Sequence, residues 1–425
     1  MSQPVPVPRS RMSRASLVEL GAWAVVAVVT AILVQQRFVA GVADGGGTDL
    51  AIFLRGAEAA SSGGDVYEEP AYTYSPLLAW VLVPIAGNAY AVEIWTALCI
   101  ASGLLAIALV VLTLRGRIPG WRAPLVAGVG VVTLFFSHVA TIELFLGQVQ
   151  LPLLALVAAA VLVGRRWPIV SGVLLAVAAL VKTWPALLLL WLARRGQPRR
   201  WWALAGASAT AVALLVTWWI VDGVDGPGRL VERTLHLGEQ RMGLYSVWYF
   251  AREGVPGTDD PLALADAPLL GQAISWVLAA VVIAGIVLVL RRPGDASLAM
   301  WNLAGATILL LPVSHPFYRV LMLPVLWVWL AILLSARRRR EPIIAVVVLG
   351  AWWVIAFRNE IWQEGWVQFA EVVVTLIAFA TSVILAARLQ PTPTLTSAPA
   401  TTSSAGTQSG GPVQAVAPPG SPDST

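Results

Sequence analysis

Apolar and polar stretches alternate along the chain in the pattern of a protein that crosses a membrane many times. Long apolar runs recur from residue 17 to residue 387, and short arginine-rich stretches separate many of them. A helical crossing needs about 20 apolar residues, because each residue advances about 1.5 Å through a hydrocarbon layer of about 30 Å. We therefore expect about ten full crossings, near residues 17–34, 89–114, 124–145, 148–163, 201–221, 271–290, 298–313, 317–335, 342–357 and 367–387.

Two apolar stretches are too short for single crossings of this kind. Residues 168–193 contain two apolar pieces on either side of Lys182-Thr183-Trp184-Pro185, and residues 76–87 form a third short piece. We expect the first two to form a short hairpin with Lys182 near its tip, and the third to be a partial span or a helix against the outer leaflet. Broken helices persist in a membrane only where protein buries them or a cavity hydrates them. Both stretches therefore predict a cavity that opens on the outer side.

The composition agrees with this pattern. Of the 425 residues, 58% are hydrophobic and 12% are charged, and the mean hydropathy is +0.77. These values predict an all-α fold, a polytopic bundle of transmembrane helices with short broken or re-entrant helices. A net charge of +5 does not indicate nucleic-acid binding, and a single cysteine, Cys99, excludes a disulfide framework. The first apolar segment is too long for a cleaved signal peptide, so it is expected to remain as an anchor.

Arginine clusters orient the expected crossings. Short loops rich in basic residues face the cytoplasm in most membrane proteins. Residues 1–16 are therefore expected to be a cytoplasmic N-terminal segment, followed by a membrane domain over residues 17–388. Residues 389–425 are rich in Pro, Thr, Ser, Ala and Gly, which predicts a disordered cytoplasmic tail. The clusters expected inside are Arg115/Arg117/Arg122, Arg165/Arg166, Arg194/Arg195/Arg199/Arg200, Arg291/Arg292 and the run from Arg337 to Arg340.

The loop after the first expected crossing begins with an acidic residue. The run Gly45-Gly46-Gly47-Thr48-Asp49 places a carboxylate a few residues beyond the membrane, where it can meet a substrate that arrives from the lipid. One hypothesis is that Asp49 is a general base. The alternative is structural: Thr48 or Asp49 caps a short amphipathic helix over residues 50–60.

Many other polar residues fall on the same outer side once the crossings are drawn. A charge at the centre of a span costs about 3 kcal/mol, so such residues persist where they are paired, hydrated or functional. Their number on one face indicates an outward polar cavity, although Glu143 could equally cap a helical hairpin. The set is Asp49, Glu68, Glu69, Tyr72, Tyr74, Glu143, Gln148, Gln150, Lys182, His236, Glu239, Gln240, His315, Arg319 and Arg358.

Three of these residues are candidates for binding an anion. Lys182 lies at the tip of the short hairpin, whereas a lysine that only reaches for lipid headgroups needs no such hairpin. His315 lies at a break between two prolines with Arg319 one turn further on, so the pair can present donors to a phosphate. Arg358 follows at the outer end of a helix and could equally anchor that end in headgroups. The chain has no phosphate-cradling glycine loop and no soluble domain for a nucleotide, which predicts a donor delivered in the membrane.

The motifs in this order are similar to those of the actinobacterial family 87 glycosyltransferases, membrane α-mannosyltransferases of the GT-C superfamily that use polyprenyl-phosphate mannose. The similarity covers roughly residues 20–388, and it departs from the family pattern at Gln150 and Glu239. The segments that carry it are Asp49 with Asp65-Val66-Tyr67 and Tyr74-Ser75-Pro76, Leu146-Gly147-Gln148-Val149-Gln150, Ser171-Gly172-Val173 leading to Lys182-Thr183-Trp184-Pro185, Gly238-Glu239-Gln240, and Pro312-Val313-Ser314-His315.

The resemblance implies an enzyme with a GT-C helical bundle in the plasma membrane and an extracytoplasmic active site. It implies transfer of a hexose, expected to be mannose, from a polyprenyl-phosphate donor to a lipid-linked or cell-envelope glycan, with inversion and without a metal or cofactor. Asp49 would be the general base. The residues expected to bind the donor phosphate or substrate are Lys182, His315, Arg319, Tyr74, Gln148, His236 and Gln240.

Two other functions fit a polar path through a helical bundle. A lipid or glycan transporter or flippase would line its path with the same residues, but such a path should also be polar on the inner side. A non-catalytic scaffold for envelope assembly is the third possibility.

Overall fold

The computed structural model describes most of the expected membrane domain. The described residues are 14–43, 47–118, 120–223, 225–241, 245–251, 268–312, 314–336, 339–358 and 365–389, without the side chains of 234–241, 268, 365 and 366. The first thirteen residues and the expected tail from residue 390 lie outside this set. Throughout the described ranges the regular elements are helices and none is a strand, which confirms the all-α fold.

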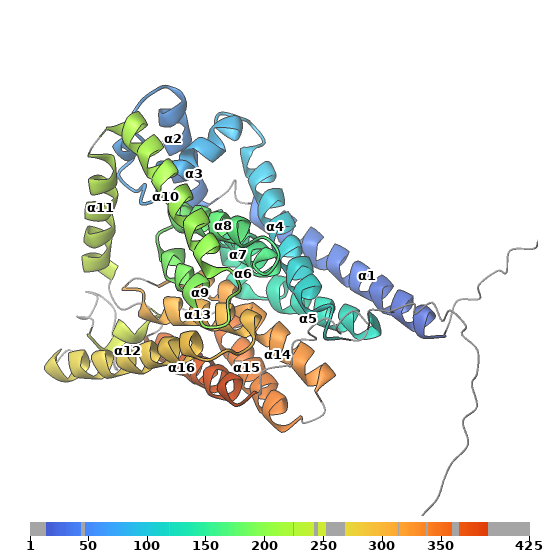
Figure 1. Ribbon diagram of the computed structural model, residues 1–425. Coiled ribbons are helices and arrows are strands. Elements are labelled where there is room, and N and C mark those ends of the chain that lie inside the picture. The colour runs from blue at the N-terminus through green and yellow to red at the C-terminus, as the bar shows by residue number, and fades with distance from the viewer. Residues whose placement is uncertain are drawn as a thin grey trace, which may run out of the picture. The chain divides into compact units, whose positions relative to one another are not determined.

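Figure 1 shows the arrangement of the helices. In chain order they are α1 (Arg14–Val42), α2 (Thr48–Ser61), η1 (Val66–Glu68), α3 (Pro76–Leu82), η2 (Val83–Ile85), α4 (Ala91–Leu114), η3 (Gly120–Arg122), α5 (Ala123–Phe135), α6 (His138–Leu146), α7 (Gln150–Val163), α8 (Pro168–Val181), η4 (Trp184–Leu189), α9 (Leu190–Ala193), α10 (Arg200–Asp222), α11 (Gly226–Arg241), η5 (Val247–Ala251), α12 (Pro268–Arg291), α13 (Ala296–Leu310), η6 (Pro316–Met322), α14 (Leu323–Ser335), α15 (Arg340–Arg358) and α16 (Gly365–Arg388).

Seven helical segments in the described residues are long and apolar enough to cross a membrane, so this is a multi-pass membrane protein. The expected count of about ten is not confirmed. The stretch 124–145 is a pair, η3–α5 and α6, that bends by 61° and would make an eighth span if it crosses as one. The helices in 148–163 and 298–313, α7 and α13, have 14 and 15 residues, and at about 1.5 Å per residue they are shorter than a membrane is thick.

The short elements predicted from the sequence are present. Lys182 separates α8 from η4 and α9 and has an extended backbone, with φ −143° and ψ 132°. The third short stretch is the helical segment Pro76–Ile85. Both expectations, a broken helical hairpin around Lys182 and a partial span after Ser75, are confirmed as far as their helical lengths are concerned.

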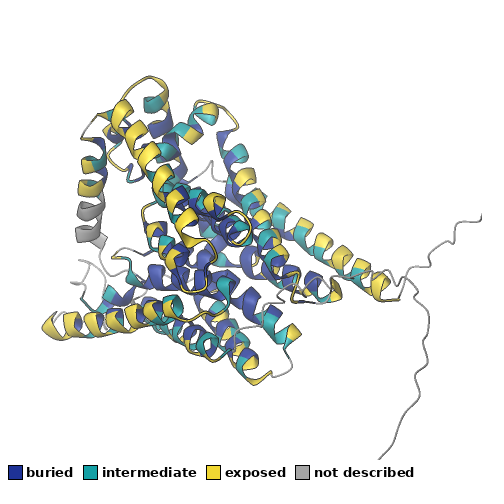
Figure 2. Ribbon diagram, in the orientation of Figure 1, coloured by how far each residue is buried: buried dark blue, intermediate teal, exposed yellow. Residues whose placement is uncertain are grey.

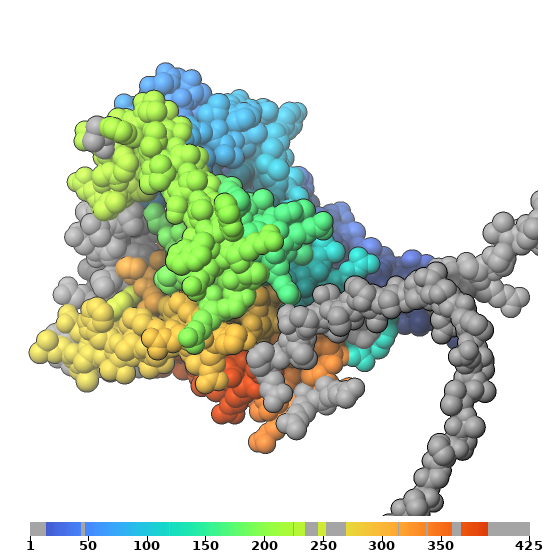
Figure 3. Space-filling model, viewed as in Figure 1, coloured from blue at the N-terminus to red at the C-terminus, as the bar shows by residue number. Residues whose placement is uncertain are grey.

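Burial separates the lipid-facing helices from the core. Only 6% of the apolar window of α1 is buried, against 78% for the window formed by η6 and α14, and Figure 2 shows the same contrast between the exposed α12 and the buried α14. Side chains of α10 and α12 form much of the surface seen in Figure 3, and they include exposed Trp202, Ile220 and Trp276. A bilayer would cover these apolar faces, since soluble proteins rarely expose so much apolar surface.

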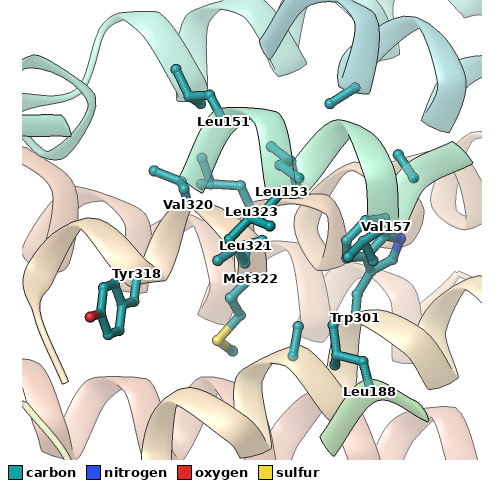
Figure 4. Packing of buried hydrophobic residues seen from close by; sticks show 14 of the residues in the cluster. Leu151, Leu153, Val157, Leu188, Trp301, Tyr318, Val320, Leu321, Met322 and Leu323 are labelled. Carbon is teal, nitrogen blue, oxygen red and sulfur yellow. The ribbon is translucent and has the colours of Figure 1, made fainter. Parts of the chain in front are cut away.

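The core is built around η6 and α14. Val320, Leu321 and Leu323 pack beside Leu151 and Leu153 of α7 (Figure 4). Buried tryptophans also contribute, and each indole N–H needs an acceptor because the hydrocarbon offers none. The bonds are Trp327 to Thr133 Oγ1 (2.8 Å), Trp329 to Ser382 Oγ (2.9 Å) and Trp352 to Thr375 Oγ1 (3.1 Å).

The loops expected on the cytoplasmic side contact one another at one end of the bundle. These contacts join segments far apart in the sequence, so the basic clusters share an end as the positive-inside pattern predicts. They are an ion pair between Arg117 and Asp295, a hydrogen bond from the Arg195 N–H to the Leu290 carbonyl (2.9 Å), and one from Arg292 Nη1 to the Ala387 carbonyl (2.7 Å).

Candidate active site

Two glycines bring the start of α2 against the end of α6. Gly147 ends α6 in the left-handed conformation, with φ 71° and ψ 35°, which glycine adopts without a steric penalty. A Cβ on Gly47 would overlap the backbone of Phe145 and Leu146, and a Cβ on Gly147 would overlap Leu50. This close backbone approach places Asp49, in the first turn of α2, beside Gln148.

Four polar side chains form a connected cluster at this contact, the Asp49 cluster. Gln148 Nε2 donates to Asp49 Oδ2, and Gln148 Oε1 accepts from Tyr74 OH at 3.0 Å and from Lys182 Nζ at 3.2 Å. Lys182 Nζ also donates to Tyr74 OH at 2.7 Å. The amide of Gln148 therefore lies between a carboxylate and an ammonium, with each end of the amide facing the partner that it can bond. Asp49, Tyr74, Gln148 and Lys182 were all predicted site residues.

Aromatic rings surround the Lys182 ammonium. Its Nζ lies 4.7 Å from the ring centroid of Tyr74, 4.5 Å from that of Tyr318 and 5.9 Å from that of Phe317. Ring faces attract a cation and hold it in place without neutralising its charge. The ammonium is therefore positioned by neutral groups and remains able to bind an anion.

His315 packs against two of the same rings. Its imidazole stacks on Phe317 with centroids 5.1 Å apart and meets Tyr318 edge-on at 5.4 Å. His315 is half-buried and precedes η6. The structure thus brings the His315 segment beside Lys182, although they lie more than 130 residues apart in the sequence.

The loop between α2 and α3 is held by its own tyrosines and by α11. Tyr67 OH donates to the Tyr74 carbonyl at 3.0 Å, and Ser75 Oγ donates to the Leu180 carbonyl, two residues before Lys182. Arg233 Nη1 donates to the carbonyls of Glu69 (2.6 Å), Pro70 (3.1 Å) and Tyr72 (3.2 Å), and its Nη2 donates to that of Tyr67. Arg229 forms an ion pair with Asp65. These contacts fix the turn that presents Tyr74.

Burial keeps the phenol of Tyr74 in its donor form. Desolvation is the main cause that raises the pKa of Tyr74 well above its ordinary value, and the nearby Tyr318 and Asp49 add to it. The phenol therefore stays protonated and can donate to Gln148 while it accepts from Lys182. The neighbouring Tyr72 is fully buried and its OH donates to the Ser75 carbonyl at 2.8 Å, so it supports the loop and presents no open ring face.

Two other carboxylates of the predicted polar set have structural partners. Glu143 Oε1 accepts the N–H of Gln150 at 2.6 Å and that of Leu151 at 3.3 Å, which stabilises the N-terminus of α7. Glu69 pairs with Arg55 at 2.5 Å, and that hydrogen bond lowers the pKa of Glu69. Asp49 is the carboxylate that accepts a hydrogen bond within the lysine-bearing cluster, and the N-cap residue of its own helix, α2, is Gly47.

Arg319 lies elsewhere among the predicted residues. It is buried, its Nη2 pairs with Glu371 at 2.6 Å, and its Nη1 donates to the Ala356 carbonyl at 3.1 Å. None of these contacts is shared with the Asp49 cluster. The side chains of His236 and Gln240 lie outside the described residues, so their predicted roles stay predictions.

Comparison with known families identifies the family to which the chain belongs. The family model named glycosyltransferase family 87 matches residues 72–314, which is more than half of the 425 residues. The chain belongs to glycosyltransferase family 87. No curated protein matches closely enough to add a relative.

Membership of family 87 makes this chain a membrane glycosyltransferase, an enzyme that transfers a sugar. The matched stretch contains Tyr74, Gln148 and Lys182, while Asp49 precedes it and His315 follows it by one residue. Sequence reasoning missed the role of Arg229 and Arg233, which hold the first loop, and the pairing of Arg319 with Glu371. An amphipathic helix with two arginines one turn apart was the available signal for the first.

Proposed function

We propose that this family 87 enzyme transfers a hexose, with mannose as the first candidate, from a polyprenyl-phosphate donor to a hydroxyl of a lipid-linked or cell-envelope glycan. The bundle is proposed to be of the GT-C type in the plasma membrane, with about ten crossings when the short and bent helices are counted. The observation that carries the proposal is the Asp49 cluster, in which a carboxylate and an ammonium face one another across Gln148.

Asp49 is the proposed general base. The acceptor hydroxyl loses its proton to the Asp49 carboxylate as its oxygen attacks the anomeric carbon, and the bond from that carbon to the phosphate oxygen breaks. The proton ends on Asp49 and polyprenyl phosphate leaves with the bonding electron pair. A single displacement of this kind inverts the anomeric carbon, and a positioned base contributes about 10²–10⁴-fold. Gln148 orients the carboxylate through its Nε2–H.

Lys182 is the proposed partner of the leaving phosphate. Negative charge develops on the phosphate oxygen in the transition state, and a cation already fixed there lowers the barrier without reorganisation. The rings of Tyr74, Tyr318 and Phe317 hold the ammonium, and His315 adjoins the same rings as a second donor. Arg319 pairs with Glu371, so it is the weakest candidate among the residues predicted to bind the donor phosphate.

Donor and acceptor are proposed to meet on the extracytoplasmic side. The Asp49 cluster is formed by segments that are separate from the arginine-rich loops expected in the cytoplasm. Lipid-linked donors are used on the side of the membrane where no nucleotide sugar is available. The described residues offer no observation that favours the transporter alternative.

A transfer assay tests the proposal. Membranes that contain the full-length protein would receive radiolabelled polyprenyl-phosphate mannose and a lipid fraction as acceptor. The proposal expects label in a glycolipid or glycan product that membranes without the protein do not form. A glucose-loaded and a galactose-loaded donor in parallel arms would identify the sugar. Movement of lipid or glycan across liposomes without transfer of sugar would instead support the transporter.

A further inference from the structure

Two arginines converge on the break between α5 and α6. Arg37 of α1 donates from Nε to the Phe135 carbonyl at 2.5 Å and from Nη1 to Thr141 Oγ1 at 2.6 Å. Arg358, at the end of α15, donates from Nη1 to the Phe136 carbonyl at 3.3 Å and stacks on the Phe136 ring at 4.2 Å. The two guanidiniums thus bind adjacent carbonyls, and each lies within electrostatic range of the other.

This pair has more positive charge than the described residues around it balance. The carbonyls at the C-terminus of α5 supply about half a negative charge, and the N-terminus of α6, which begins at His138, adds about half a positive charge. Among the described residues, no carboxylate forms an ion pair with Arg37 or Arg358. Within the described part of the chain, nearly two positive charges therefore remain at the edge of the bundle, where charges persist only if they are paired or hydrated.

The geometry leaves donors free to bind an anion. Arg37 Nη2 and Arg358 Nε and Nη2 make no hydrogen bond to a described residue, and Arg37 is half-buried while Arg358 is exposed. The carbonyls of Phe135 and Phe136 fix the direction of both side chains, so little side-chain entropy is lost when a ligand binds. Two fixed guanidiniums match the oxygens of a phosphate better than a mobile lysine does.

We propose that Arg37 and Arg358 form a binding site for the phosphate of a lipid headgroup. The site is separate from the Asp49 cluster, because its arginines bond Phe135, Phe136 and Thr141 before and in the first turn of α6, whereas Gln148 follows the end of that helix. The rise along α6 from His138 to Leu146 is about 12 Å. The ligand chemistry is a phosphate ester on a lipid, which can come from a bilayer phospholipid or from a lipid-linked substrate.

The experiment measures lipid retention on the purified full-length protein by native mass spectrometry. Phosphatidylglycerol is the anionic probe, diacylglycerol is the probe without phosphate, and polyprenyl phosphate is the competitor. The variants are Arg358→Gln and the double variant Arg37→Gln/Arg358→Gln, since glutamine can still donate to the α5 carbonyls. Arg166→Gln is the matched control, because Arg166 is also exposed and stacks on a neighbouring ring, that of Trp167, at 5.1 Å.

Wild-type and Arg166→Gln proteins are expected to retain phosphatidylglycerol and not diacylglycerol. Arg358→Gln should raise the half-saturating concentration of phosphatidylglycerol about tenfold or more, as expected for a lost charge-assisted contact, and the double variant should raise it further. Displacement by polyprenyl phosphate assigns the site to a lipid-linked substrate, and its failure to displace assigns it to a bilayer lipid. Equal loss in Arg166→Gln, equal retention of diacylglycerol, or unchanged retention in Arg358→Gln would overturn the proposal. No step requires sugar transfer, so the outcome is independent of the proposed reaction.

Discussion

Asp49 accepts a hydrogen bond from Gln148 and lies in the first turn of α2. A carboxylate in a first helical turn also interacts with the helix dipole, which stabilises the helix by about 0.3–1 kcal/mol. The N-cap residue is Gly47, which has no side chain to cap the helix. The structural alternative for Asp49 is therefore a weak dipole contribution and not the N-cap hydrogen bond that the sequence allowed.

Replacement of Asp49 by asparagine separates these two roles. Asparagine keeps the volume of the side chain and can still accept the Gln148 hydrogen bond, but it cannot accept the hydroxyl proton. Transfer is expected to fall by about 10² or more, while expression and donor binding persist. Asp49→Glu should keep a small residual rate because it retains a misplaced base. Initial transfer rates and donor binding would be measured, and near wild-type transfer by Asp49→Asn would remove Asp49 from the base role.

Arg319 can also be tested by substitution, because a structural pair with Glu371 and a contact with the donor phosphate predict different outcomes. Arg319→Met leaves the Glu371 carboxylate buried and unpaired, which is expected to cost about 3–5 kcal/mol. The double variant Arg319→Met/Glu371→Leu removes both charges and should recover most of that stability. Thermal unfolding in detergent and donor KM would be measured for both. A stable double variant with wild-type donor KM assigns Arg319 to structure, whereas a raised donor KM supports the predicted phosphate contact.

The residues of the site were predictable to different degrees. Asp49 and Lys182 stand out in the sequence because each interrupts an apolar pattern at an expected membrane boundary. Arg319 also does, but a sequence does not show that Glu371, 52 residues further on, shares its burial. The identity of a charge's partner depends on packing between distant helices, and hydropathy contains no information on that packing.

Helix α11 acts on the site through the loop that it holds. Arg233 binds four carbonyls between Tyr67 and Tyr72, and the same loop continues into Tyr74, which contacts both Gln148 and Lys182. One planar guanidinium thus connects an amphipathic helix to the phenol of the cluster. We expect Arg233 to be a positioning residue, since it touches none of the four cluster side chains.

Arg233→Gln is expected to lower kcat for transfer about tenfold, because Tyr74 loses its fixed loop, with a smaller change in donor KM. Arg233→Lys should recover only part of the rate, since an ammonium cannot bind several carbonyls in one plane. The matched control is Arg55→Gln. This change removes the exposed ion pair between Arg55 and Glu69 of the same loop, and it should change the rate little. An equal loss in both variants would show that any charge lost from the loop matters, and Arg233 would have no special role.

Most helices could be predicted from the sequence, but hydropathy does not show whether lipid or protein surrounds an apolar helix. Seven expected crossings coincide with long apolar helices, and the broken pieces around Lys182 and after Ser75 appear where their lengths predicted them. Helices α7 and α13 are apolar on all sides because protein surrounds them. Such helices have the same composition as lipid-facing spans, so hydropathy alone does not distinguish the two kinds of helix.

At the scale of the whole molecule, two distinct sets of contacts join loops that are far apart in the sequence. The Arg117–Asp295 pair and the hydrogen bonds of Arg195 and Arg292 join the basic loops at one end. The contact of Asp49 with Gln148 joins the first turn of α2 to the segment after α6, and that of Tyr74 with Lys182 joins the loop before α3 to the segment after α8. These two sets share no residue. The structure groups the loops, while the charge pattern predicts that the basic end is cytoplasmic.

Cysteine labelling in intact cells tests this orientation. Ser61→Cys at the end of α2 and Arg340→Cys at the start of α15 are both exposed positions, and the native Cys99 is buried and should not react. A membrane-impermeant maleimide is expected to label Cys at 61 from outside and to label Cys at 340 only after the cells are opened. Permeabilised cells serve as the control that both thiols are reactive. Labelling of position 340 from outside would place the Asp49 cluster in the cytoplasm and would remove the argument for a lipid-linked donor, since nucleotide sugars are present on that side.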